Sequence, residues 1–120
     1  MKLLNRSAFT VLPRQPFVDW VNQLPQDDEA LNHLMTLEEH RQEGTVYLID
    51  EVDSEQALTD ALHQHWIGMF ENELAAWEEF GDCWPEARTL EMFEQWFELK
   101  PQVLALDLSD APLMTARLDG

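Results

Sequence analysis

The first half of the chain alternates β-forming stretches with short amphipathic segments. Residues 7–13, SAFTVLP, are rich in β-forming side chains and predict a strand that stops at a proline. Four apolar residues then recur at i, i+3, i+4 and i+7, which predicts one face of a short helix. They are Phe17, Trp20, Val21 and Leu24. Residues 45–49, TVYLI, form a continuous apolar run with little polar alternation, so we expect a strand at the centre of its sheet.

Between the two predicted strands, the spacing of polar and apolar residues predicts two short helices. Residues 27–35 give a weak helical signal. Residues 36–44 give a stronger one, because Thr36 and Glu39 have the spacing of a capping box and Gly44 is a candidate C-cap.

The second half predicts two longer helices and a last strand. The long helix covers residues 53–80, with Asp53 three residues before Gln56 at capping-box spacing. The next helix covers residues 86–99 and begins after a proline, and residues 103–108 read as a strand.

This order of elements, β-α-β-α-α-β, defines the predicted fold class. It predicts an α+β fold, or a small α/β fold, in which a sheet of about three strands is packed by helices in two layers. We expect residues 1–108 to form a single compact domain and residues 109–120 to form a C-terminal tail or an extra edge segment.

The strongly negative charge of the chain restricts the classes of molecule that it can bind. Aspartate and glutamate number 24 against 7 lysines and arginines, a net charge of −17, and no basic residue lies between Arg41 and Arg88. Such a surface repels the phosphate backbone of nucleic acids and anionic membranes, and it attracts basic proteins. Acidity that serves only solubility remains the alternative. Because Cys83 is the only cysteine and no stretch has membrane-spanning length, we expect a cytoplasmic protein.

One carboxylate stands out within the long helix. At 100° per residue, Glu73 falls in the middle of the apolar arc, where an unpartnered charge would be costly to bury. We expect it to be largely buried and ion-paired with an arginine, first Arg88 and otherwise Arg6 or Arg14. A bend in the helix or a functional acid are the alternatives. His63 borders the same apolar face, so Glu73, Arg88 and His63 form the candidate pocket.

The predicted helix at 86–99 provides a candidate interaction surface. One side carries a row of carboxylates and the other is apolar, and tryptophans occur within and just before the helix. The surface residues are Trp84, Trp96, Glu91, Glu94 and Glu98. The chain contains no phosphate-binding glycine loop and no nucleophile elbow, so we predict no catalytic residue, no cofactor and no metal site.

Four stretches in order resemble a known family. They are NRSAFTVLPRQPFVDWVNQL, TVYLIDE, FENELAAW and CWPEARTLEMFEQWFEL, and the similarity extends from about Leu4 to Leu108. The chain resembles a family of small acidic bacterial proteins of unknown function. The resemblance implies a bacterial cytoplasmic protein with one compact α/β domain, and it implies no catalytic or ligand-binding residues.

These features favour a non-enzymatic protein that acts through protein–protein contacts of an acidic, aromatic-containing face. The partner is unknown; a basic protein and a second copy of the chain are both compatible with the sequence. A small enzyme or ligand-binding protein, with a cleft near Glu73, Arg88 and His63, is the alternative from another class. A nucleic-acid mimic that occupies the groove of a basic protein is a lesser alternative.

Overall fold

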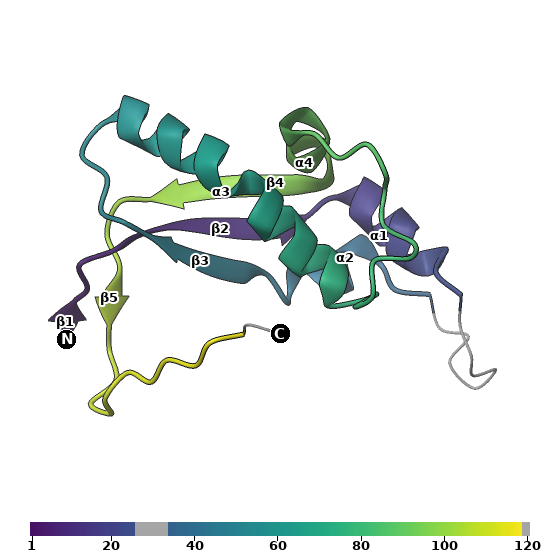
Figure 1. Ribbon diagram of the computed structural model, residues 1–120. Helices are drawn as coiled ribbons and strands as arrows, with labels where there is room; N and C mark the ends of the chain where they lie inside the picture. The colour runs from purple at the N-terminus through teal and green to yellow at the C-terminus, as the bar shows by residue number, and fades with distance from the viewer. Residues whose placement is uncertain (26–33, 119–120) are drawn as a thin grey trace.

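The computed structural model describes residues 1–25 and 34–118, and these contain both helices and strands (Figure 1). The mixture confirms the predicted α+β class. In chain order the elements are β1 (Lys2–Leu3), β2 (Ser7–Pro13), α1 (Gln15–Asn22), α2 (Leu37–Arg41), β3 (Thr45–Ile49), α3 (Glu55–Ala75), α4 (Leu90–Trp96), β4 (Phe97–Gln102) and β5 (Leu106–Asp107).

The main sheet has three antiparallel strands in the order β3-β2-β4. The central strand is β2, in which Phe9 lies opposite Tyr47 on one side and Pro101 on the other. The predicted central position of residues 45–49 is therefore wrong. On β3 the exposed side chains of Val46 and Leu48 alternate with the more buried ones of Tyr47 and Ile49. The sequence does not reveal this alternation, because the exposed residues are as apolar as the buried ones.

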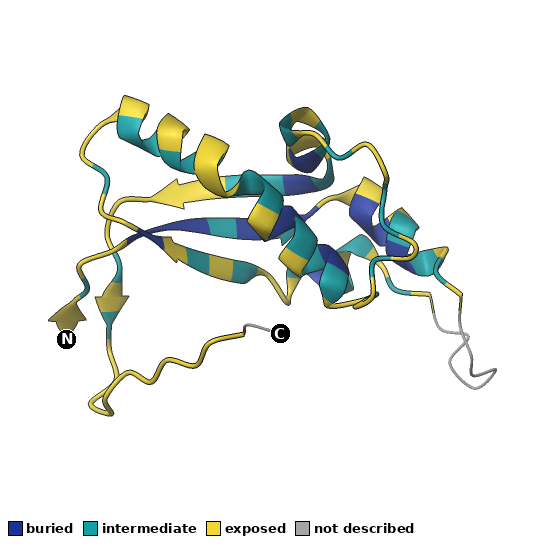
Figure 2. Cartoon of the chain, viewed as in Figure 1, coloured by how far each residue is buried: buried dark blue, intermediate teal, exposed yellow. Residues whose placement is uncertain are grey.

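Helix α3 crosses one face of this sheet, and α4 packs beside it (Figure 1). The core lies between the helices and the inward faces of the strands, and Figure 2 shows that burial is concentrated in β2, in part of α1 and in the C-terminal half of α3. Its fully buried large side chains are aromatic or aliphatic. They include Val11, Phe17, Val18, Phe70, Leu74, Phe93 and Phe97.

The long helix is shorter at both ends than its predicted range. Its N-cap is Ser54, whose hydroxyl accepts a hydrogen bond from the Ala57 N–H at 3.1 Å, and not Asp53 one residue earlier. The helix ends at Ala75, and Gly81 adopts a φ of +84° in the loop that follows. That left-handed conformation favours glycine, so this residue helps to turn the chain toward α4.

The predicted helix at 86–99 is divided between a helix and a strand. Thr89 caps α4 by accepting from the Met92 N–H, and the helix ends at Trp96. Phe97 then begins β4, because the free edge of β2 pairs with the next six residues; the Arg14 N–H extends this pairing to the Trp96 carbonyl at 2.8 Å. The last predicted strand, 103–108, is reduced to β5, which pairs with β1 and not with the main sheet.

The capping box on α2 is confirmed, since Thr36 accepts from the Glu39 N–H and the Glu39 carboxylate accepts in return. Gly44 is not a C-cap. A Cβ at this position would lie 2.5 Å from a methyl group of Leu12 on β2, so the glycine permits a close approach of the two segments. The weak helix expected at 27–35 lies mostly outside the described residues.

A buried hydroxyl joins the ends of three segments. Ser7, at the start of β2, is fully buried; its Oγ donates to the Val103 carbonyl at 2.9 Å and accepts from the Val52 N–H at 3.0 Å. These bonds satisfy backbone groups just beyond β3 and β4. Residues 109–118 contain no helix or strand and are exposed. No helix in the described part of the chain is long and apolar enough to cross a membrane.

Candidate functional site

Glu73 lies on the side of α3 that faces β3, where it is half-buried. Its hydrogen-bond partner is a tyrosine of β3. The Tyr47 hydroxyl, which projects from β3, donates a short hydrogen bond to Glu73 Oε2 and accepts one from Asn72 Nδ2 at 2.9 Å. Thr45, two residues earlier on β3, also hydrogen-bonds the Glu73 carboxylate. The Glu73 carboxylate, in the apolar arc of α3, is thus hydrogen-bonded by two polar side chains on the same face of β3.

Burial dominates the electrostatics of this pair. It raises the pKa of the Glu73 carboxyl above its usual value, and the hydrogen bonds from Tyr47 and Thr45 offset part of that rise. Burial and the hydrogen bond to Glu73 raise the pKa of the Tyr47 phenol well above 10. The phenol therefore stays protonated and donates throughout the physiological pH range.

The alkaline titration of Tyr47 is a direct test, because it is the only tyrosine in the chain. Since its folded-state pKa is raised, the phenol stabilises the fold below pH 10, and that contribution is lost as pH rises through the folded-state value. Ultraviolet absorbance should show no tyrosinate while circular dichroism still shows a folded chain. Tyrosinate that appears near pH 10 in the folded protein would contradict this arrangement.

The predicted arginine partner of Glu73 is wrong. Arg88 pairs with Glu71, with 3.0 Å between Nη2 and Oε2, and also donates to the Pro85 carbonyl at 2.8 Å. Residues 71 and 73 point about 200° apart on a helix, so a side chain from the loop before α4 reaches the outer residue and not the inner one. Arg6 and Arg14 are exposed, and the Arg6 guanidinium donates to the Asn5 carbonyl.

The three residues of the candidate pocket are not brought together. Glu73 faces β3 from α3 and contacts Tyr47. Arg88 lies in the loop before α4, and His63 is exposed on α3. A shallow pocket does lie beside β3, lined by Tyr47, Leu48, Ile49, His65, Gly68 and Met69, but none of the three predicted residues lines it. Within residues 1–25 and 34–118, no three His, Cys, Asp or Glu side chains cluster as a metal site requires.

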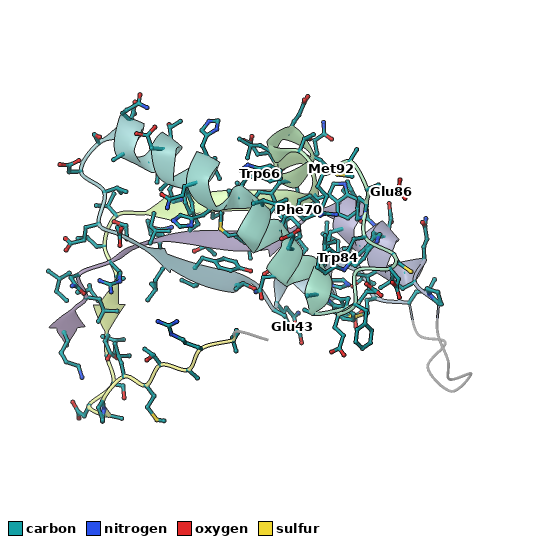
Figure 3. All side chains as sticks on the ribbon, viewed as in Figure 1. Glu43, Trp66, Phe70, Trp84, Glu86 and Met92 are labelled. Carbon is teal, nitrogen blue, oxygen red and sulfur yellow. The ribbon has the colours of Figure 1, made fainter. Side chains whose placement is uncertain are left out.

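The two predicted surface tryptophans face inward. The Trp84 indole N–H donates to the Glu78 carbonyl at 2.7 Å, and the Arg88 guanidinium lies 5.5 Å from the Trp84 ring centre. Trp96 packs against the rings of Phe17 and Phe70. Figure 3 shows Trp66, Phe70 and Met92 where α3 approaches α4, so most aromatic side chains of this region serve the core.

The three predicted surface glutamates are separated. Glu91 and Glu94 are exposed on α4 as expected. Glu98 is not on that helix: it lies on β4 and forms an ion pair with Arg41, which lowers the pKa of its carboxyl. Because the helix ends at Trp96, the acidic row contains two carboxylates and not three.

The loop between α3 and α4 exposes aromatic side chains that the sequence interpretation assigned to the helix. Phe80 is 80% exposed, and Trp77 is also exposed, although its ring centre lies 5.0 Å from that of buried His40. The acidic residues Glu79 and Asp82 flank Phe80 and are exposed. We call residues 77–83 the aromatic loop.

Hydrogen bonds fix the backbone of the aromatic loop. The Gly81 N–H donates to Glu78 Oε2 at 2.7 Å, and the indole of Trp20 on α1 donates to the Cys83 carbonyl at 2.9 Å. The Trp84 indole anchors the other side through the Glu78 carbonyl. An exposed phenylalanine on a hydrogen-bonded loop is presented at little conformational cost, which is the property of a binding anchor.

No family model matches the chain, and neither a curated protein nor a solved structure matches it significantly.

Proposed function

We propose that this chain is a non-catalytic protein-binding module whose aromatic loop docks a cationic partner protein. The observation that carries the proposal is the exposure of Phe80 on a hydrogen-bonded loop between acidic side chains. The partner would offer an apolar pocket for the ring, surrounded by lysine or arginine side chains. The proposal retains the acidic, aromatic face expected from the sequence and moves its aromatic anchor from Trp84 and Trp96 to Phe80.

The charge distribution supports a cationic partner. Residues 7–102 contain 4 basic and 21 acidic residues, so 4 minus 21 accounts for the whole net charge of −17. Two of the four basic residues are used internally, since Arg41 pairs with Glu98 and Arg88 with Glu71. Like charge repels anionic partners, and the attraction of cationic ones raises the rate of association.

The engagement of Glu73 supports a non-catalytic role. A general acid or base must reach a substrate proton, but this carboxylate is occupied by Tyr47 and Thr45. We place the protein in the bacterial cytoplasm, in keeping with its resemblance to small acidic bacterial proteins and with a single exposed thiol, Cys83, which a reducing compartment would preserve.

Affinity capture from a bacterial cytosol at two salt concentrations tests the proposal. Immobilised wild-type protein should retain basic proteins at low salt and release them at high salt, because exposed charge pairs are screened beyond about 10 Å at 0.1 M. The Phe80→Ala variant should lose most of the same retained proteins at low salt, and the Glu79→Gln/Asp82→Asn variant should lose part of them.

The matched control is Val46→Ala, which shortens another exposed apolar side chain, on the face of β3 opposite to Tyr47. It should retain the same proteins as the wild type. Capture that survives Phe80→Ala, or that is lost equally in Val46→Ala, would overturn the assignment of the aromatic loop as the docking site.

A further inference from the structure

Strand β3 forms the lower edge of the main sheet in Figure 1, and the outer side of this strand is free. It pairs with β2 on one side, and within residues 1–25 and 34–118 no other segment hydrogen-bonds it through the backbone. Alternate residues of an edge strand point their N–H and C=O groups outward, where a further extended strand can pair with them. The free edge is therefore a backbone template of five residues.

A small pocket opens beside this edge, between β3 and α3. It has a volume of about 170 Å³ and is lined by Tyr47, Leu48, Ile49, His65, Gly68 and Met69. Successive side chains of a strand point to opposite faces, so three consecutive residues line one pocket only along the edge of their strand. The pocket is smaller than the roughly 300–1,000 Å³ of small-molecule sites, and it suits a single apolar side chain.

Gly68 opens this pocket to the surface. It is an exposed residue within α3, where glycine is less favourable than alanine, and its φ is not in the left-handed region. A Cβ placed on it would meet no atom within 4 Å, so no contact within the described chain requires a glycine here. The glycine does provide open space directly beside the free edge of β3.

Carboxylates flank the free edge at both ends. Four of them are exposed: Glu43 before the strand, and Asp50, Glu51 and Asp53 after it. The basic residues closest in the register are Arg6, which precedes β2, and Lys100 on β4, two strands away; neither lies on the outer side of β3. Lysine or arginine at both ends of an added strand would be attracted to this edge, whereas a second copy would bring the same carboxylates to it.

We propose that β3 binds an extended basic segment of another protein, which adds to the main sheet as a fourth strand and places one apolar side chain in the pocket beside Gly68. Backbone hydrogen bonds hold the segment, the pocket selects the apolar residue, and the flanking carboxylates select lysine or arginine at its ends. The inference goes beyond the proposed function, because it involves neither Phe80 nor the aromatic loop.

Fluorescence anisotropy with synthetic peptides and the full-length chain tests the proposal. The probe is a labelled peptide with leucine at the centre of a short β-forming run and lysines at both ends. It should bind with a dissociation constant in the high micromolar range, and more weakly at high salt. A matched peptide with glutamates in place of the lysines should show no binding. A lysine peptide with serine in place of the central leucine should bind at least about tenfold more weakly.

Gly68→Leu is the corresponding variant of the protein, because the new side chain enters the open pocket. It should raise the dissociation constant of the lysine peptide by at least about tenfold, while circular dichroism shows an unchanged fold. The matched control is Thr59→Leu, which adds a leucine at an exposed position on the opposite side of α3 and should leave the constant unchanged.

Three results would each overturn the proposal: no binding of the lysine peptide, equal binding of the lysine and glutamate peptides, or the same affinity for the leucine and serine peptides. Self-association of the wild type that Gly68→Leu abolishes would assign the edge to a second copy instead. The Phe80→Ala variant should bind the lysine peptide as the wild type does. A site this weak releases its partner during the washing of an affinity matrix, so this inference and the proposed function can fail separately.

Discussion

Replacing Phe70 by alanine is expected to lower the free energy of unfolding by about 3–5 kcal/mol, the usual cost of removing a buried phenylalanine. The ring is fully buried and packs against three aromatic side chains of α4 and β4. Ring centres lie 5.3 Å away in Phe93, 5.7 Å in Trp96 and 5.9 Å in Phe97. A cavity here removes contacts of α3, α4 and β4 at once, and small domains are stable by only about 5–15 kcal/mol.

Urea denaturation followed by tryptophan fluorescence would measure the loss. Phe80→Ala is the matched control, since it deletes the same atoms from an exposed position and should change stability by no more than about 0.5 kcal/mol. If Phe70→Ala does not fold, Phe70→Leu provides a milder change with the same direction. Equal stability of the Phe70→Ala and Phe80→Ala variants would contradict the described core.

Removing the Tyr47 hydroxyl is the second large effect. Tyr47→Phe keeps the ring but leaves the half-buried Glu73 carboxylate without its main hydrogen-bond donor, which should cost about 1–3 kcal/mol near neutral pH. The Asn72 amide loses its acceptor at the same time. Urea denaturation at several pH values would follow the change.

The cost of Tyr47→Phe should depend on pH in a defined direction. The pKa of Glu73 is raised, so its contribution to stability is fully present below the unfolded value of 4.5 and is lost as pH rises through the folded value. Tyr47 lowers that pKa by bonding the charged form, so its removal raises the pKa further and costs more at neutral pH than in acid. In a Glu73→Gln background this pH dependence should disappear. A cost of Tyr47→Phe that is the same in both backgrounds and at all pH values would contradict the pairing.

The parts of the fold encoded by neighbouring residues were predictable. The capping box of Thr36 and Glu39 and the strand at 7–13 depend on local spacing, and both occur as expected. Helical projection also identified Glu73 as a polar residue within an apolar arc. Its partner was not predictable, because Tyr47 reaches it only through the packing of α3 across β3, a contact between segments 26 residues apart.

The two boundary errors have one physical origin. Phe93 and Phe97 lie four residues apart, which satisfies a helical period, so the sequence favours continuing α4 through Phe97. Pairing with the free edge of β2 outweighs that local preference and turns Phe97 into the first residue of β4. The longer helix was predicted to continue through residue 80 for the same reason, because Trp77 and Phe80 also fit a helical period. That prediction placed Phe80 on an apolar helix face, so the exposed aromatic loop was not recognised.

The position of β3 at the edge of the main sheet has a consequence for solubility. An uncharged edge strand of β-branched and aromatic residues presents unpaired backbone groups that can template the addition of another chain. Here the segment is bracketed by acidic residues, Glu43 before it and Asp50, Glu51 and Asp53 after it. These carboxylates act as gatekeepers against fibrous aggregation. We therefore expect the acidity at this edge to oppose the addition of a second copy of the chain to β3.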